Sequence, residues 1–284
     1  MEKLEAKKRI EEIEQIYNEM QGDYTSYSAL IKGVEGSGKS TFLTTGRLPI
    51  LVDLFDPKGA VLFNTDPRLI RLRKERKLFV RFFIKENSQQ PTEYLRWEKQ
   101  WQKDCKSGFL SMFGTYGVDS GTTWLEAMAN YITHAKGGKR DYLIQGIRKT
   151  GNLQIEDYIP MYNMVMDLIK LSSSQGCDFI YIAHLVRKTI GDGEFSQVVT
   201  ELDTYERLKS KIPKLFAEKY CMVKKPSSQG SKRILLLDST GEYEASSQLM
   251  ASGKLKKEEE PNLKELLKKA GLPTEDKPLV WNND

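Results

Sequence analysis

The feature that most constrains this chain is a glycine-rich segment placed between two elements of different type. The segment, Gly33-Val-Glu-Gly-Ser-Gly-Lys-Ser-Thr41, fits the pattern Gly-x4-Gly-Lys-Ser of a phosphate-binding loop. An apolar run from Ala29 to Ile31 predicts a buried strand before it, and residues 40–45 can begin a helix after it. Strand, loop and helix in this order favour a genuine phosphate site over a chance glycine-rich turn.

The loop predicts a binding site for the phosphates of a nucleotide. Its glycines let the backbone curl so that successive N–H groups converge on phosphate oxygens. We expect Lys39 to lie between the β- and γ-phosphates and the Ser40 hydroxyl to ligate Mg²⁺. The candidate nucleotide-binding residues are Gly33, Val34, Glu35, Gly36, Ser37, Gly38, Lys39, Ser40 and Thr41.

Composition is typical of a globular protein. Of 284 residues, 39% are hydrophobic and 29% charged, which is enough apolar material for a substantial core. No apolar run approaches the roughly 18–20 residues of a membrane span, and no signal-peptide pattern opens the chain, so we expect a cytoplasmic protein without a membrane partner. The three cysteines, Cys105, Cys177 and Cys221, are widely separated, which argues against a disulfide framework or zinc site. The net charge of +5 permits a polyanionic partner.

Periodicity divides the chain into three parts. Residues 1–22 read as an amphipathic helix, and its apolar stripe packs either on the protein's own core or on a neighbouring subunit. The stripe comprises Ile10, Ile13, Ile16, Tyr17 and Met20. Residues 23–248 alternate strands with helices, which predicts an α/β domain with a mostly parallel sheet. Residues 249–284 form a charged tail with one short helix, which begins near Pro261 and stops at Gly271.

A nucleotide hydrolase of this class needs an acid at the end of a second strand, next to the first, to hold Mg²⁺ through water. Asp119 and Asp238 both follow strand-like runs. The run before Asp238 is more apolar, whereas the one before Asp119 is rich in Gly and Thr. We favour Asp119, because several elements already separate Asp238 from the loop, and we interpret Asp238 as a turn residue.

Two further residues are candidates for catalysis. Asp56 follows the apolar run 50–53, whose strand we expect alongside the loop, and could orient the attacking water. The alternative for Asp56 is an Asp-Pro turn without a catalytic part. His184 ends an apolar strand that begins at Asp178, at the carboxyl edge where ligands bind in open α/β sheets. It could contact the γ-phosphate and report hydrolysis, or be a purely structural histidine.

Basic residues gather in the connections 136–153 and 186–203, which we interpret as loops on one face of the domain. Such loops suit sequence-neutral binding of single-stranded DNA. The candidate DNA-binding residues are Arg140, Arg148, Lys149, Arg187 and Lys188. A third basic group, within residues 68–81, mixes with Leu and Glu and is interpreted as a solvated helix face.

The order of these parts resembles the phage-encoded RecA-fold ATPases used in single-strand annealing and recombination. The residues that carry the resemblance are the loop, Ile50–Gly59, Val118–Ser120 and Tyr158–His184. The resemblance implies a RecA-like core with ATP and Mg²⁺ as cofactors, Ser40 and Asp119 as metal residues and His184 as sensor. It also implies a ring or filament of identical subunits, single-stranded DNA as partner, and contact with phage single-strand binding or recombination proteins in the host cytoplasm.

The sequence departs from this pattern at one place. Proteins of this type set a basic residue near the last strand to reach a neighbour's nucleotide, but residues 243–247 contain none. Lys224 or Lys225 could substitute. Two other functions therefore stay open: an ATP-binding module that docks onto a DNA-processing or packaging complex with little turnover, and a small-molecule phosphotransferase, for which we recognise neither a lid nor an acceptor pocket.

Overall fold

The computed structural model describes most of the chain. The described residues are 5, 7–15, 27–87, 91–135, 142–144, 147–149, 153, 155–191, 196–228 and 230–282. Among them no helix is long and apolar enough to cross a membrane. The three cysteines are free, as their spacing indicates.

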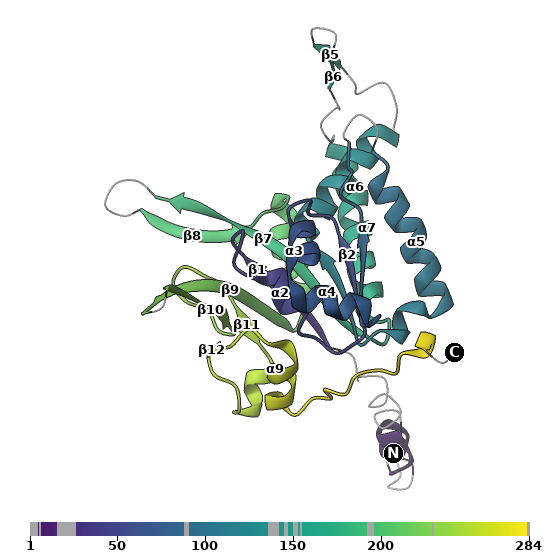
Figure 1. The fold of residues 1–284 in the computed structure, drawn as a ribbon, viewed down its shortest axis with the longest axis vertical. Coiled ribbons are helices and arrows are strands. Elements are labelled where there is room, and N and C mark those ends of the chain that lie inside the picture. The colour runs from purple at the N-terminus through teal and green to yellow at the C-terminus, as the bar shows by residue number, and fades with distance from the viewer. Residues whose placement is uncertain are drawn as a thin grey trace.

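A ten-stranded sheet forms the centre of the molecule (Figure 1). Eight of its strands follow the order β12-β10-β9-β1-β7-β4-β2-β3, while β11 pairs with β9 and β8 pairs with β7. Strands β9, β1, β7, β4, β2 and β3 run parallel, whereas β10, β11, β12 and β8 pair antiparallel. The bounds are β1 Ser28–Gly33, β2 Ile50–Leu54, β3 Leu78–Phe82, β4 Thr115–Asp119, β7 Asp178–Ile190, β8 Gln197–Leu202, β9 Glu218–Ser227, β10 Gly230–Leu236, β11 Ser246–Ser247 and β12 Glu258–Glu259. The predicted α/β class with a mostly parallel sheet is confirmed.

The strand order differs from the expected one in two respects. β7 lies between β1 and β4, so the strand that ends at Asp119 is not next to the strand that ends at the loop. β2 pairs with β4 and β3, not with β1, so Asp56 follows a strand two places further from the loop than expected. The reason is that β4 and the first half of β7 are both fully buried, and the chain sequence does not dictate which of them pairs with β1.

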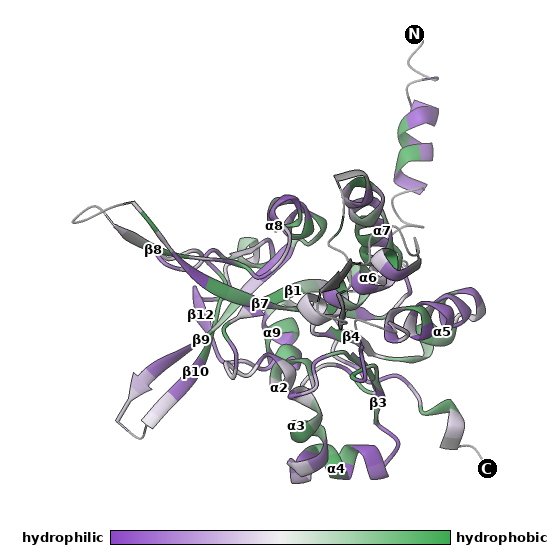
Figure 2. Cartoon of the chain, turned by 90° about the horizontal axis from the view of Figure 1, so that it is seen from above, coloured by the Kyte–Doolittle hydropathy of each residue, from purple (hydrophilic) through white to green (hydrophobic). Residues whose placement is uncertain are grey.

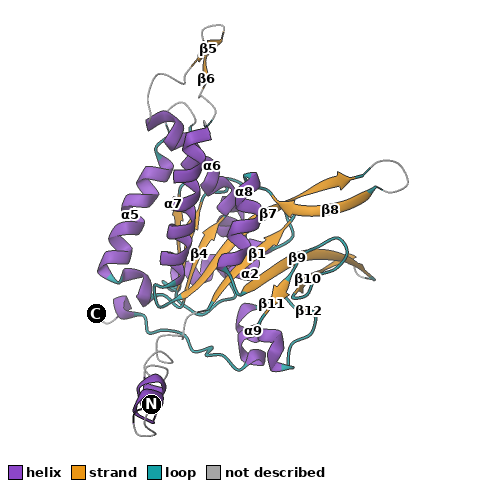
Figure 3. Ribbon diagram, turned by 180° about the vertical axis from the view of Figure 1, so that it is seen from behind, coloured by secondary structure: helices purple, strands orange, loops and turns teal. Residues whose placement is uncertain are grey.

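Helices cover both faces of the sheet. On one face lie α5 Glu93–Ser107, α6 Gly121–Ala135, α7 Ile155–Ser173 and α8 Glu206–Lys211 (Figure 3). On the other lie α2 Lys39–Leu43, α3 Gly59–Thr65, α4 Pro67–Lys74 and α9 Leu263–Ala270 (Figure 1). Short 3-10 turns occur at Phe109–Met112, Ile212–Leu215, Leu249–Ser252 and Val280–Asn282.

Alternation along the strands creates two hydrophobic cores, one on each face. In β1, Leu30 joins the core beneath α5, α6 and α7, whereas Ala29 and Ile31 join the core beneath α2, α3 and α4. The first core is rich in aromatic rings. For example, Trp97 and Trp101 of α5 stack with 5.5 Å between their ring centroids. Figure 2 shows the apolar colouring concentrated in the central strands. This packing holds the carboxyl edge of the sheet, where the loop lies, in a fixed position.

Two antiparallel hairpins extend from the sheet (Figure 3). β7 and β8 form the first, from Leu185 paired with Leu202 to Ile190 paired with Gln197. For the described residues the expectation of a long loop at 186–203 is therefore wrong: β-branched residues such as Val186, Thr189 and Val198 continue the strand pairing beyond the compact core. β9 and β10 form the second hairpin. A separate two-stranded sheet joins β5 Tyr142–Ile144 and β6 Ile147–Lys149.

The two ends of the chain differ in their packing. Residues 7–15 are helical, and Ile10 and Ile13 are 56% and 65% exposed, so these two do not pack on the protein's own core. Ile16, Tyr17 and Met20 lie outside the described residues. At the other end, Asn262 caps α9, whose Leu263, Leu266 and Leu267 are buried in the second core. Beyond α9 the chain crosses the base of the sheet toward α5 (Figure 1).

Candidate active site

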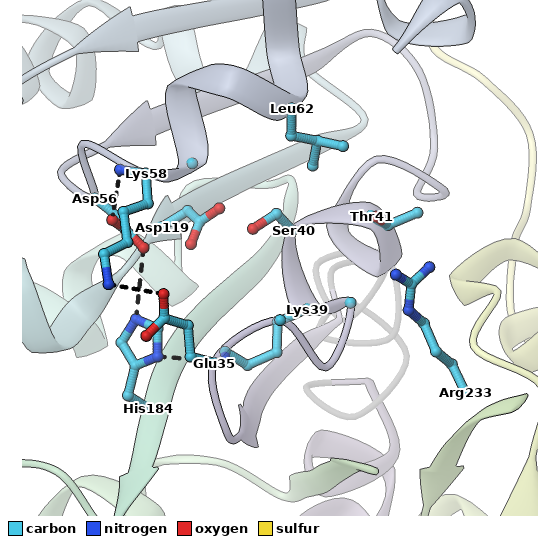
Figure 4. Close-up of a pocket in the computed structure, with 13 residues that line it drawn as sticks. Glu35, Lys39, Ser40, Thr41, Asp56, Lys58, Leu62, Asp119, His184 and Arg233 are labelled. Atoms are coloured by element: carbon cyan, nitrogen blue, oxygen red, sulfur yellow. Dashed lines mark hydrogen bonds and ion pairs between the residues drawn. The ribbon is translucent and has the colours of Figure 1, made fainter. Parts of the chain in front are cut away.

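One pocket at the carboxyl edge of the sheet collects most of the residues that the sequence analysis selected. Its cavity of about 260 Å³ is lined by loop residues and by Asp56, Asp119 and His184 (Figure 4). These three side chains come from the ends of β2, β4 and from β7. Three separate strands thus converge on the loop, although of these three only β7 pairs with β1.

Lys39 occupies the centre of this pocket. Its ammonium donates hydrogen bonds to the carbonyl oxygens of Gly33 at 2.8 Å and Val34 at 3.0 Å, and lies 3.4 Å from Nδ1 of His184. The side chain is only 5% exposed. Burial lowers the pKa of Lys39 to about 8, against the opposing charges of Asp119 and Asp56. Main-chain carbonyl oxygens of the loop therefore hold the Lys39 ammonium in place, and phosphate oxygens can replace them as its hydrogen-bond acceptors.

Asp119 lies beside Ser40 with one oxygen lacking a partner. The carboxylate is 3% exposed, and its Oδ2 has no hydrogen-bond partner within the described part of the chain. Burial raises the pKa of Asp119 to about 6, and a hydrogen bond with Ser40 acts in the opposite direction. An unpaired buried carboxylate oxygen next to a hydroxyl is the hard oxygen donor set that Mg²⁺ prefers. The residues present fit Mg²⁺.

The protein offers few oxygen ligands for such an ion. Within the described residues no group of three or more His, Cys, Asp or Glu could hold a metal on its own. Mg²⁺ commonly binds through one or two carboxylates together with substrate phosphates, rather than in an all-protein cage. Ser40 and Asp119 match that minimal arrangement, with nucleotide phosphates left to supply further oxygens.

Asp56 and His184 form a second pair in the pocket. Nε2 of His184 lies 3.7 Å from Oδ2 of Asp56, and Oδ1 of Asp56 accepts a hydrogen bond from the Lys58 backbone at 2.9 Å. When the Lys39 ammonium donates to Nδ1, the ring proton belongs on Nε2, facing Asp56. Interaction with His184 lowers the pKa of Asp56 against the effect of burial. Asp56 thus serves the turn after β2 with one oxygen and faces the pocket with the other.

Four lining residues were not selected from the sequence: Lys58, Gly59, Leu62 and Arg233. Lys58 makes an exposed ion pair with Glu35 at 2.8 Å. Leu62 lines the pocket because α3, which carries it, lies beside the loop. Arg233 comes from β10, nearly two hundred residues after the loop in the chain, and no local pattern announces its place in the pocket. The only sequence signal was its place at the start of the apolar run that precedes Asp238.

Of the residues proposed for DNA, Arg187 and Lys188 do not line this pocket. Arg187 and Lys188 are on the β7–β8 hairpin, where Arg187 lies 3.2 Å from Glu242 and Lys188 lies 3.8 Å from Glu201. Arg148 and Lys149 are in β6, and Arg140 lies outside the described residues. The two hairpin cations are thus already engaged with carboxylates of the same chain, at exposed positions where such pairs are weak.

Two alternatives raised by the sequence are also located. Asp238 lies outside the pocket, where it pairs with Lys257 at 2.8 Å and accepts from the backbone of Ser239. It is a turn residue, as interpreted. In the basic group 68–81, Arg81 is not solvated but donates to the buried Asp53 and Asp104. That network, completed by Trp97 and Tyr116, is structural and lies within the first core.

Comparison with known proteins adds little to this geometry. No protein-family model and no curated protein matches the chain. Among solved structures, a KaiC-like protein of the hyperthermophilic archaeon Pyrococcus horikoshii is similar at 15% sequence identity, with a TM-score of 0.37, over 78% of this chain and 82% of that one.

Proposed function

We propose that this protein binds Mg-ATP at the loop of residues 33–41 and hydrolyses it. The observation that carries the proposal is the unpaired, buried Oδ2 of Asp119 beside Ser40, in the same pocket as Lys39. A lone buried carboxylate oxygen is costly unless a cation or donor meets it. A structural carboxylate would have been given a partner by the fold, as Asp53 and Asp178 have been.

Each residue of the pocket has a chemical part in this proposal. Loop N–H groups and Lys39 bind the phosphates and offset their charge, and a bound Mg²⁺ would supply further charge neutralisation at the γ-phosphate. Asp56 orients the attacking water. Its lowered pKa makes it a weak base, so it positions the water rather than removing its proton early. His184, between Lys39 and Asp56, is placed to respond when the γ-phosphate leaves.

We further propose that hydrolysis is coupled to single-stranded DNA in phage recombination, annealing or replication, with the chain assembled as a ring or filament in the host cytoplasm. The support is the continuity of β7: His184 and Arg187 stand three residues apart on one strand, which runs from the pocket into the projecting hairpin (Figure 3). DNA phosphates would compete with Glu242 and Glu201 for Arg187 and Lys188. Phage single-strand binding or recombination proteins are the partners that this function implies.

A second candidate function is an ATP-binding switch on a DNA-processing or packaging complex, with little turnover. Two observations favour it: the hairpin cations are already paired with Glu242 and Glu201, and Lys225 pairs with Glu258 of its own chain. Lys225, one of the two candidates for reaching a neighbour's nucleotide, is thus engaged within its own chain.

Phosphate release from ATP separates the two functions. We expect Mg²⁺-dependent release that rises several-fold when an oligonucleotide single strand is added, and no comparable rise with duplex of equal phosphate content. Tight ATP binding with negligible release under both conditions would support the switch instead. Absence of ATP binding would refute both.

A further inference from the structure

The hairpin of β9 and β10 carries four cations on two faces. Cross-strand partners in an antiparallel pair share a face, so the register places Lys224 with Arg233 on one side and Lys225 with Lys232 on the other. All four side chains are exposed. In Figure 2 the outer part of this hairpin is coloured hydrophilic, away from the apolar centre of the sheet. The hairpin thus presents two chemically similar faces in different surroundings.

The two faces differ in how their charges are met. On the outer face Lys225 pairs with Glu258, and Lys232 lies 3.1 Å from Glu260. On the inner face Lys224 and Arg233 make no ion pair or side-chain hydrogen bond to any described residue. The fold therefore neutralises one pair of cations with glutamates and leaves the other pair without an anion.

The inner face lies against the loop of the same chain. A methyl group added at Gly38 would lie 2.6 Å from Cδ and 2.9 Å from Nε of Arg233. One added at Gly36 would lie 3.6 Å from Nζ of Lys224. Both glycines have positive φ, and the closeness at Gly38 shows that the loop and the arginine stem are in direct contact. Arg233 also lines the phosphate pocket itself.

The position of Arg233 within the pocket indicates which phosphate it can reach. In Figure 4, Asp56, Asp119 and His184 lie toward one end, Lys39 and Ser40 in the middle, and Arg233 beside Thr41 at the opposite end. Lys39 serves the β- and γ-phosphates in a loop of this type, and Ser40 the metal. The end beyond them, nearest Thr41, corresponds to the α-phosphate. A guanidinium there can bind a phosphate through two parallel N–H groups.

We propose that Arg233 binds the α-phosphate of the nucleotide held by its own chain, with Lys224 adding positive potential at the loop tip. This inference rests on the proposed nucleotide site and identifies a binding contact within it. Arg233 is a binding residue: it touches a phosphate that is present in both ATP and ADP and takes no part in the bond that breaks. The contribution of Arg233 to nucleotide affinity is therefore the same before and after hydrolysis, and it does not depend on which base the nucleotide carries.

The test compares nucleotide affinities of four proteins: the parent, Arg233→Ala, Arg233→Lys, and Lys232→Ala as control. Lys232 is the neighbouring cation on the opposite face, so its replacement removes equal charge without touching the pocket. Equilibrium dissociation constants are measured for ATP, ADP and CTP with Mg²⁺. We expect Arg233→Ala to weaken all three by a similar factor of about tenfold or more, Arg233→Lys to fall between, and Lys232→Ala to match the parent.

Each contrary result has a distinct meaning. Unchanged affinity in Arg233→Ala overturns the inference. A loss of affinity confined to ATP also overturns it, because it would place the guanidinium at the γ-phosphate. A loss confined to the adenine nucleotides does the same, because it would place the guanidinium on the base. Lys39→Ala separates this failure from failure of the proposed function. If Lys39→Ala loses binding while Arg233→Ala keeps it, the nucleotide site stands and only the role of the arginine falls. If the parent binds no nucleotide, both fall.

Discussion

At the scale of single residues, the pocket is defined by where polar groups have partners and where they do not. Lys39 is held by two main-chain carbonyl oxygens, Asp56 by a backbone N–H and His184, whereas Oδ2 of Asp119 has no partner within the described chain. The sequence predicted the loop because its motif is local, and it predicted Asp119 because an acid ends a strand. It missed Arg233, whose approach to the loop depends on tertiary packing alone.

Replacement of Asp119 by Asn should separate nucleotide binding from turnover. The amide keeps the shape of the carboxylate but removes the charge needed for Mg²⁺, so we expect ATP affinity within a few-fold of the parent and phosphate release lowered by about 100-fold or more. Asp238→Asn is the matched control, because Asp238 also ends a strand-like run but lies outside the pocket. Normal turnover in Asp119→Asn, or a loss in Asp238→Asn, would move the metal site away from β4.

The raised pKa of Asp119 also predicts a pH dependence of stability in the absence of nucleotide. The folded pKa of about 6 exceeds the ordinary value of 3.8, so the protonated form is favoured by folding. Stability from this group is therefore complete below pH 3.8 and lost as pH rises through 6, by about 3 kcal/mol at most. Urea unfolding at pH 4 and pH 7.5 should show Asp119→Asn gaining on the parent as pH rises. A constant difference would contradict the buried, unpaired carboxylate.

At the scale of elements, β7 connects the pocket to the projecting hairpin. The sequence predicted a strand at 178–184 from its apolar run, but the polar stretch that follows suggested a loop. Residues 185–190 instead stay paired with residues 197–202 of β8, because the hydrogen bonds between the two strands satisfy the backbone even where little side-chain surface is buried. The place of β7 between β1 and β4 was likewise beyond prediction, because several apolar runs of similar length could occupy a central position in a parallel sheet.

The hairpin of β7 and β8 provides a test of DNA binding. Replacing Arg187 and Lys188 by Ala should weaken binding of single-stranded DNA and reduce the slope of log K against log salt by roughly 0.7 for each DNA phosphate that the variant no longer neutralises. Both are exposed, with ion pairs that contribute little to stability, so the fold should persist. Lys225→Ala with Lys232→Ala removes equal charge from the other hairpin and serves as control. Equal affinity and slope in the Arg187/Lys188 variant and the parent would place the DNA-binding surface elsewhere.

At the scale of the whole molecule, two cores on opposite faces of one sheet hold the pocket, and the tail belongs to the second of them. Leu263, Leu266 and Leu267 of α9 are buried against residues of β1, β2 and α2. Lys277 donates to the carbonyl oxygens of Ser111 and Gly176, both at 2.6 Å, at the base of the sheet. The short helix was predictable from its bounding residues. Its docking onto the core was not, because the charged residues on both sides of the three leucines are typical of a solvated tail.

Truncation of one of these leucines should destabilise the entire protein. We expect Leu266→Ala to lower the free energy of unfolding by about 2–5 kcal/mol, since the side chain is 2% exposed and leaves a cavity. Leu171→Ala, at a position 46% exposed on α7, should cost far less. Denaturant unfolding followed by circular dichroism gives both values. A small effect of Leu266→Ala, with a separate early transition, would mean that the tail unfolds independently of the sheet.

The account as a whole depends on the pocket being a site for Mg-ATP. The most direct measurement is calorimetric titration of the parent and of Lys39→Ala with ATP, in the presence and absence of Mg²⁺, with Lys58→Ala as control. Lys58 lines the same pocket but is exposed and paired with Glu35. We predict binding by the parent that is strengthened by Mg²⁺, near-parent binding by Lys58→Ala, and an affinity lower by about tenfold or more in Lys39→Ala. Binding by Lys39→Ala equal to the parent, or none by the parent, would contradict the account.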